Sequence, residues 1–153
     1  MIPGPFLLYL GHSDDEVGIK TSRGLATFRR EDCVGEGRHD DSPLTLDLPR
    51  MDVAEARAAG ARTLVLGIAN AGGQMEPALV EDALVAIHAG MNVASGLHQR
   101  LRDVPTLVQA AADAGVALFD VRDPPAGLRV GTGTHRAGNR LLTVGTDCSV
   151  GKM

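Results

Sequence analysis

The chain has 153 residues, a formal net charge of −4 and a pI near 5.7. This acidic balance lacks the basic face that non-specific nucleic-acid binding needs, so we expect no nucleic-acid partner. The two cysteines, Cys33 and Cys148, form no CxxC pair, which favours free thiols in a reducing, cytoplasmic compartment.

The first predicted element is a buried strand over 5–11. Residues 2–11, IPGPFLLYLG, are apolar but contain two prolines and two glycines. This pattern fits neither a signal peptide nor a membrane span of about 20 residues, so no membrane partner is expected. The following GHSDDE, over 11–16, fits a solvated helix start with Ser13 or Asp14 as N-cap, or a hard-metal site. The helix start needs no ligand, and no metal site is predicted.

Helices and strands are then predicted in alternation. The segment over 35–49 is polar and rich in turn formers, which indicates a surface excursion, and a short strand over 44–48 is one way for it to end. Glycines stand where helix C-caps belong, at positions 60, 90 and 115. The periodicity predicts helices over 51–59, 77–89 and 106–114, and strands over 61–69, 91–97, 115–122 and 141–145.

This alternation predicts an α/β fold, a Rossmann-like doubly wound, mostly parallel sheet with helices on both faces. We expect residues 1–122 to form this Rossmann-like N-terminal domain. The loop-rich stretch over 123–140 reads as a linker that could hold a small hairpin. In such sheets ligands bind outside the carboxyl ends of the strands, so the loops after the strands are the candidate site.

Two of these loops carry candidate substrate-binding residues. Consecutive glycines before the helix at 77 could direct backbone amides at an anion, or could only make a tight turn that needs positive φ. After the next strand, a histidine and an arginine could orient a carboxylate or phosphate, or could be solvated loop residues. The candidates are Asn70, Gly72, Gly73, Gln74, His98 and Arg100.

The last stretch, LLTVGTDCSVGKM over 141–153, reads as a strand followed by a phosphate-binding loop. In a Walker A loop, backbone amides and a lysine hold phosphates, and a Ser or Thr binds magnesium. Here the first glycine stands one position early and Met153 replaces the hydroxyl, which weakens an ordinary Mg-ATPase reading. A glycine-containing tail that mimics the motif is the alternative. The predicted cofactor-binding residues are Gly145, Thr146, Asp147, Cys148, Ser149, Val150, Gly151 and Lys152.

Several of these stretches, in order, resemble the D-glutamate N-acetyltransferase family. They are FLLYLG, CVGEG, GIANAGGQM, ASGLHQRL and LLTVGTDCSVGKM, and together they cover essentially the whole chain. The resemblance implies a Rossmann-like N-terminal domain followed by a P-loop NTPase-like domain, whose first strand and loop would be residues 141–153. The loop also resembles that of dethiobiotin synthetases, which accounts for the early glycine.

The resemblance implies acetyl transfer from acetyl-CoA to the amino group of a D-amino acid, with D-glutamate as the leading substrate. The terminal loop would hold phosphates of CoA, or of ATP or another nucleotide. We expect small-molecule substrates, a homo-oligomer and little activity from this fragment alone. An ATP-dependent ligase or kinase and a non-catalytic Rossmann-like binding module remain as alternatives. The sequence assigns no catalytic base.

Overall fold

The computed structural model describes residues 1–123, 127–129, 131–135, 137–139, 141 and 143–144, with only the backbone of Ala71. The chain divides into two units, Met1–Asp123 and Pro124–Met153. All of the helices and strands given below lie in the first unit. The predicted phosphate-binding loop, Gly145 to Lys152, lies outside the described residues and stays a prediction.

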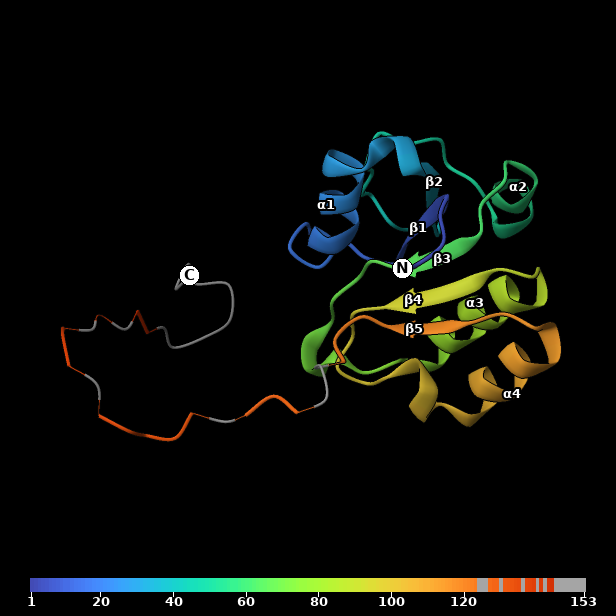
Figure 1. The fold of residues 1–153 in the computed structure, drawn as a ribbon. Coiled ribbons are helices and arrows are strands. Elements are labelled where there is room, and N and C mark those ends of the chain that lie inside the picture. Colours follow the sequence, from blue (N-terminus) through green and yellow to red (C-terminus); the bar gives the residue numbers. More distant parts are fainter. Residues whose placement is uncertain (124–126, 130, 136, 140, 142, 145–153) are drawn as a thin grey trace. The chain divides into compact units, whose positions relative to one another are not determined.

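The first unit contains five strands and four α-helices in alternation (Figure 1). Most of these elements match ones predicted from the sequence, but the strands are shorter than predicted by one to several residues at their ends. The strands are β1 (Phe6–Gly11), β2 (Cys33–Arg38), β3 (Thr63–Leu66), β4 (Asn92–Ser95) and β5 (Leu118–Asp120). The helices are α1 (Lys20–Phe28), α2 (Val53–Ala58), α3 (Pro77–His88) and α4 (Pro105–Ala114). Short 3-10 turns cover Arg30–Asp32, Ala71–Gly73 and Leu101–Asp103.

The strands form one parallel sheet in the order β2-β1-β3-β4-β5. The chain moves from β1 to β2 in one direction and then crosses back to β3 on the other side of β1. Right-handed crossovers therefore place α1 on one face and α2, α3 and α4 on the other. The predicted α/β, Rossmann-like fold with helices on both faces is confirmed.

Each face of the sheet has its own apolar core. Along β1 the side chains alternate, so that Leu7 and Tyr9 join one core while Leu8 and Leu10 join the other. The first core contains the buried faces of α2, α3 and α4, and α3 and α4 lie side by side beneath β4 and β5 (Figure 1). The second contains α1 and the segment after β2. The sheet is thus buried on both sides, as parallel sheets are.

The segment after β2 differs from its prediction. Leu44 and Leu46 are buried, but residues 44–48 form no strand, so that prediction is wrong. This segment is held by a side chain and not by pairing with a strand. The buried carboxylate of Glu36 accepts hydrogen bonds from the Leu46 amide at 2.5 Å and from Thr45 Oγ1 at 3.2 Å. Residues 35–38, predicted as part of a surface excursion, instead form most of the edge strand β2.

The first helix also begins later than predicted. The carboxylate of Asp15 accepts hydrogen bonds at 3.1 Å from the amides of Val17 and Gly18, which makes a local turn rather than a helix start. Helix α1 begins at Lys20. The residues between β1 and α1 therefore form a loop at the carboxyl end of β1.

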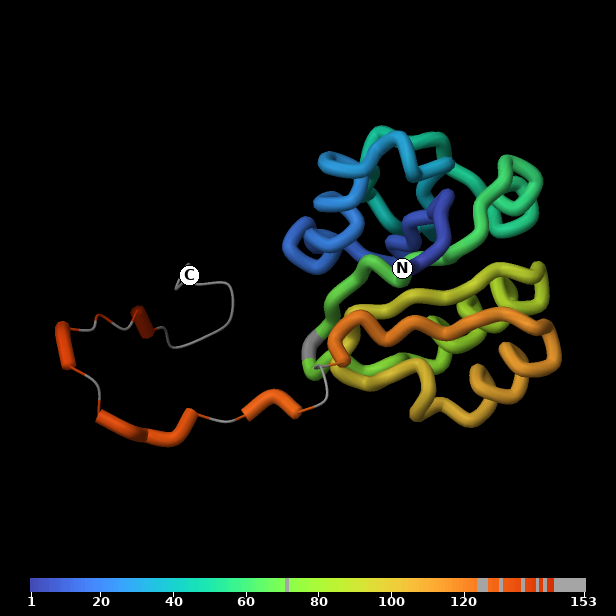
Figure 2. Tube along the Cα trace, in the orientation of Figure 1, coloured from blue at the N-terminus to red at the C-terminus, as the bar shows by residue number. Residues whose placement is uncertain are grey.

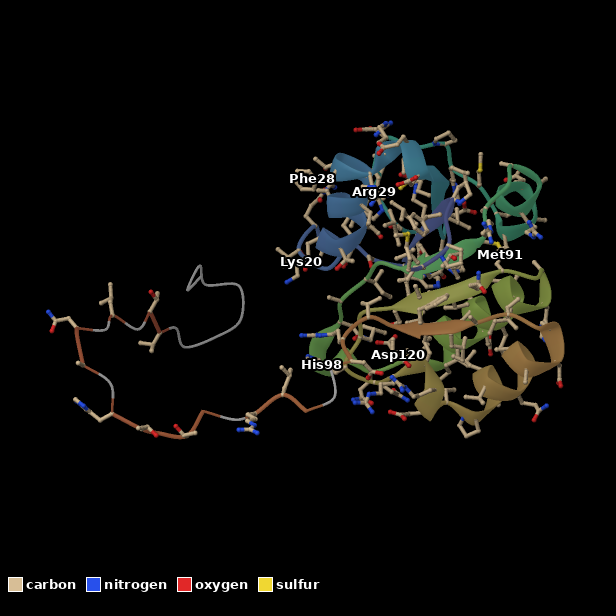
Figure 3. The ribbon with its side chains drawn as sticks, viewed as in Figure 1. Lys20, Phe28, Arg29, Met91, His98 and Asp120 are labelled. Carbon is tan, nitrogen blue, oxygen red and sulfur yellow. The ribbon has the colours of Figure 1, made fainter. Side chains whose placement is uncertain are left out.

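The sheet order defines a topological switch point beside β1. The chain first adds β2 on one side of β1 and then crosses back to add β3 on the other side (Figure 2). Open parallel sheets bind ligands outside the carboxyl ends of the strands at such a point. Figure 3 separates the two edges of the sheet: Met91 precedes β4 at the amino edge, whereas Asp120, the last residue of β5, and His98 lie at the carboxyl edge. In the described part of the chain, no helix combines the length and apolarity needed to cross a bilayer.

Candidate functional site

A cavity of about 310 Å³ lies at the switch point. Its walls are the carboxyl end of β1, the loop that follows β1, the loop after β3, and the first half of α3. Small-molecule sites occupy roughly 300–1,000 Å³. The cavity is therefore large enough for a small metabolite, and it lies where the fold predicts a ligand.

The cavity is acidic. Four acidic residues line it, Asp14, Asp15, Glu76 and Asp82, and none of the described lining residues is a lysine or arginine. The first turn of α3 adds the opposite polarity, because amides at a helix N-terminus have no partners within the helix and carry partial positive charge. Ala78 and Leu79 of that turn also line the cavity. A ligand with an ammonium group for the acidic residues and a carboxylate for the helix N-terminus would match both parts of this lining.

Asn70, a sequence-predicted residue, lines the cavity through the loop after β3. Its Nδ2 donates to the Gln74 carbonyl at 2.8 Å and lies 3.4 Å from Glu76 Oε1. These contacts fix the orientation of the amide. Its Oδ1 is buried and has no hydrogen-bond partner among the described residues. A buried acceptor of this kind costs free energy unless a donor reaches it.

One wall carries a tyrosine bound to a carboxylate. Tyr9 is on β1, and its hydroxyl donates to Asp82 Oδ2 on α3. The same hydroxyl lies 3.0 Å from Nε2 of His39, which in turn is 3.4 Å from Asp82 Oδ2. Burial, followed by the hydrogen bond to Asp82, raises the pKa of Tyr9 above its usual value. Tyr9 is therefore a neutral hydrogen-bond donor that holds Asp82 at the cavity.

A second histidine connects the loop after β1 with the segment after β2. Nδ1 of His12 lies 2.8 Å and 2.9 Å from the two carboxylate oxygens of Asp41. The His12 ring stacks on that of His39, with centroids 3.8 Å apart and planes 5° from parallel. The hydrogen bond from His12 lowers the pKa of the Asp41 carboxyl. His12 lines the cavity, so a fixed imidazole stands at its wall.

The predicted glycine loop and the loop after β4 lie side by side. The Gln99 amide donates to the Gly73 carbonyl at 2.9 Å, and Gln99 Oε1 accepts from the Met75 amide at 2.8 Å. Gly73 has φ of 61°, and a Cβ there would lie 2.4 Å from His98 Cδ2. Gly72 also has positive φ, at 80°. The turn thus requires glycine for its backbone, and it brings His98 against the loop that carries Asn70.

Arg100 is held away from the cavity by an ion pair. Its Nε lies 3.0 Å from Asp123 Oδ1, and the neighbouring Arg102 binds Asp120 at 3.1 Å and also contacts Asp123. His98 Nε2 lies 3.4 Å from Arg122 Nη1. Of the predicted substrate-binding residues, only Asn70 lines the cavity. Gly72, Gly73, Gln74 and His98 belong to the loops beside it.

Sequence reasoning missed the cluster formed by Tyr9, His12, His39, Asp41 and Asp82. The signal existed for three of them: His12 follows the predicted strand over 5–11, within the GHSDDE segment, and His39 and Asp41 come after β2, at the carboxyl edge of the sheet. The sequence does not predict β2 as a strand, so the rule that ligands bind after strands does not apply to the segment that follows it. Among the described residues, no group of three or more His, Cys, Asp or Glu side chains is arranged to hold a metal ion.

Comparison with known proteins agrees with this fold. Residues 31–124 match a domain of unknown function, DUF1611_N, described as a Rossmann-like domain. The chain belongs to this family. A crystal structure of a DUF1611 family protein from Anabaena variabilis superposes with a TM-score of 0.68 at 26% identity, over 84% of this chain and 39% of that one.

Two curated relatives carry a functional name. The chain is 41% identical over 152 residues to a D-glutamate N-acetyltransferase from a Pseudoalteromonas species, and 42% identical over 153 residues to one from Tritonibacter scottomollicae. These alignments cover 99% and 100% of this chain but 46% of each relative. The resemblance inferred from the motifs is confirmed, and the chain spans about half the length of the curated relatives it matches.

Proposed function

We propose that the full-length protein transfers an acetyl group from acetyl-CoA to the amino group of a D-amino acid, with D-glutamate as the leading substrate. The names of the two curated relatives support the reaction. Within this chain, we assign the switch-point cavity to the amino acid. The predicted loop from Gly145 to Lys152 would hold phosphates of the co-substrate.

The observation that carries this proposal is the two-sided polarity of the cavity. An amino acid presents an ammonium group and a carboxylate on the same carbon. The carboxylate fits the amides of Ala78 and Leu79 in the first turn of α3, while the ammonium fits the carboxylate of Asp82. A nucleotide phosphate would bring several negative charges and no ammonium group to these four acidic residues, so the cavity suits the acceptor amine better than a phosphorylated donor.

The side-chain carboxylate of D-glutamate has no cationic partner among the described lining residues. We therefore assign only the amino and α-carboxylate groups to the cavity wall. The side-chain carboxylate would lie toward the solvent-facing side, where the side chain of His12 is 53% exposed. Neither relative is named as a kinase or ligase, and no observation in the cavity favours those alternatives.

The test uses the full-length protein and follows thiol release from acetyl-CoA with a chromogenic reagent. D-glutamate should release thiol and L-glutamate should not. Asp82→Asn should raise KM for D-glutamate about 10- to 100-fold, because a hydrogen bond to a charged group contributes about 1.5–3 kcal/mol. Glu81→Gln, at an exposed neighbour on α3, is the matched control and should leave KM unchanged. Absence of thiol release with every D-amino acid, or magnesium-dependent ADP release without it, would overturn the proposal.

A further inference from the structure

We propose that His12 is the general base of the acetyl transfer and that Asp41 positions its ring. The inference rests on the proposed function and assigns to this chain a catalytic group that the sequence alone did not supply. It is carried by one juxtaposition: an imidazole at the cavity wall that a carboxylate engages through Nδ1 and a second imidazole supports by stacking.

The contact with Asp41 determines which nitrogen of His12 can act. An ionised carboxylate only accepts hydrogen bonds, and the lowered pKa of Asp41 keeps it ionised. Nδ1 of His12 must therefore carry the proton that it shares with the two Asp41 oxygens at 2.8 Å and 2.9 Å. In the neutral ring, Nε2 then bears the lone pair. A carboxylate that orients an imidazole in this way is the usual arrangement of a histidine base.

Stacking fixes the plane of the ring. The rings of His12 and His39 are 3.8 Å apart and nearly parallel, and His39 is itself held by Tyr9 at 3.0 Å. Tyr9 is part of β1, so the orientation of His12 is tied to the sheet although His12 itself lies in a loop. The groups that position the ring thus come from β1 and from the segment after β2, and Asp82 of α3 binds Tyr9 in turn.

The reaction balances with His12 as the only added base. Nε2 accepts one proton from the bound ammonium, and the amine lone pair forms a C–N bond with the thioester carbonyl carbon. The C–S bond then breaks, its electron pair leaves on sulfur, and the second proton from nitrogen converts the thiolate to a thiol. His12 returns its proton to water. The products are the amide, the thiol and one proton.

This assignment predicts an acid limb in the pH profile of kcat/KM. A ring that has already taken up a proton cannot accept one from the amine, so the rate should fall as the pH is lowered. The cluster contains a second imidazole, that of His39, whose contribution must be separated. The other titratable groups that face His12 or line the same cavity are Asp41, Tyr9, Asp14, Asp15, Glu76 and Asp82.

The experiment compares His12→Gln with His88→Gln in the full-length protein. His88 is exposed near the C-terminus of α3, so its variant controls for the general loss of a histidine. His12→Gln should lower kcat about 10²- to 10⁴-fold, the usual contribution of a general base, with little change in KM for D-glutamate. It should also remove the acid limb, whereas His39→Gln should lower the rate but keep the limb. Asp41→Asn should lower kcat in the same direction, and added imidazole should partly restore His12→Gly.

The outcomes separate this inference from the proposed function. If the wild-type protein releases thiol with D-glutamate but His12→Gln keeps both the rate and the acid limb, the function stands and the inference is wrong. If His12→Gln loses activity but retains the acid limb in its residual rate, a structural role explains the loss and the inference is also wrong. If the wild-type protein releases no thiol, the proposed function fails first and His12 has no reaction to catalyse.

Discussion

The contact between α1 and the end of β3 makes Gly67→Ala the sharpest stability test of the fold. A Cβ at Gly67 would lie 1.6 Å from Ser22 Oγ, 2.7 Å from Ser22 Cβ and 3.0 Å from the Ser22 backbone nitrogen. Rotation of the hydroxyl relieves only the first contact, so α1 must shift away from the sheet. Overpacking lowers the free energy of unfolding by about 1–3 kcal/mol. Because one of these contacts is with backbone that cannot rotate away, we expect a loss near 3 kcal/mol for Gly67→Ala.

Thermal unfolding followed by circular dichroism measures the effect. About 3 kcal/mol should lower Tm by roughly 12 °C in a unit of this size. Gly24→Ala is the matched control on the same helix, because a Cβ there meets nothing within 4 Å. It should instead stabilise the chain by about 0.5–1 kcal/mol through helix propensity. In a Ser22→Gly background the penalty of Gly67→Ala should fall by at least about 1 kcal/mol. A loss below about 1 kcal/mol for Gly67→Ala alone would refute the packing argument.

Three further outcomes follow from local contacts. Glu36→Gln should lower the free energy of unfolding in urea by about 3 kcal/mol, because the buried Glu36 carboxylate lies 3.1 Å from Arg38 Nε and its removal breaks this ion pair. An unchanged midpoint would contradict this. Asp52→Ala removes the capping box of α2 and should lower the free energy of unfolding by about 1 kcal/mol in the same assay; a midpoint equal to the wild-type value would contradict this. In a Cys148→Ser background, Cys33 should react with iodoacetamide at pH 8 more slowly than in the urea-unfolded chain, because burial raises its pKa; equal rates would disprove this.

The sheet was predictable wherever a strand is a continuous apolar run. The strands β1, β3 and β4 have buried side chains on both faces, so their sequences carry a clear signal. The edge strand β2 reads CVGEGR and carries no such run. Its glycine at position 35 admits the Pro49 carbonyl, which would lie 2.5 Å from a Cβ, and its glutamate is buried only because the following loop supplies donors. Neither feature is visible without the fold.

The candidate site was predictable to the same extent. Asn70 follows β3, a predicted strand, and the rule that ligands bind after strands found it. His39 and Asp41 follow β2, which was not predicted, so the rule could not reach them. Tyr9 and Asp82 lie within a strand and a helix that are apparent from the sequence. Their contact depends on the placement of α3 over β1, which comes from sheet order rather than from any local pattern.

Ion pairs after β5 lie where the chain leaves its first unit. Asp123 is the last residue of that unit and binds both Arg100 and Arg102, which follow β4. Because all five strands are parallel, this exit point lies at the same edge as the cavity. A fusion partner or reporter joined after Asp123 would thus start from the edge that carries the cavity, whereas one joined ahead of Met1 would not. Engineering of sensors from this unit should therefore use the C-terminal junction.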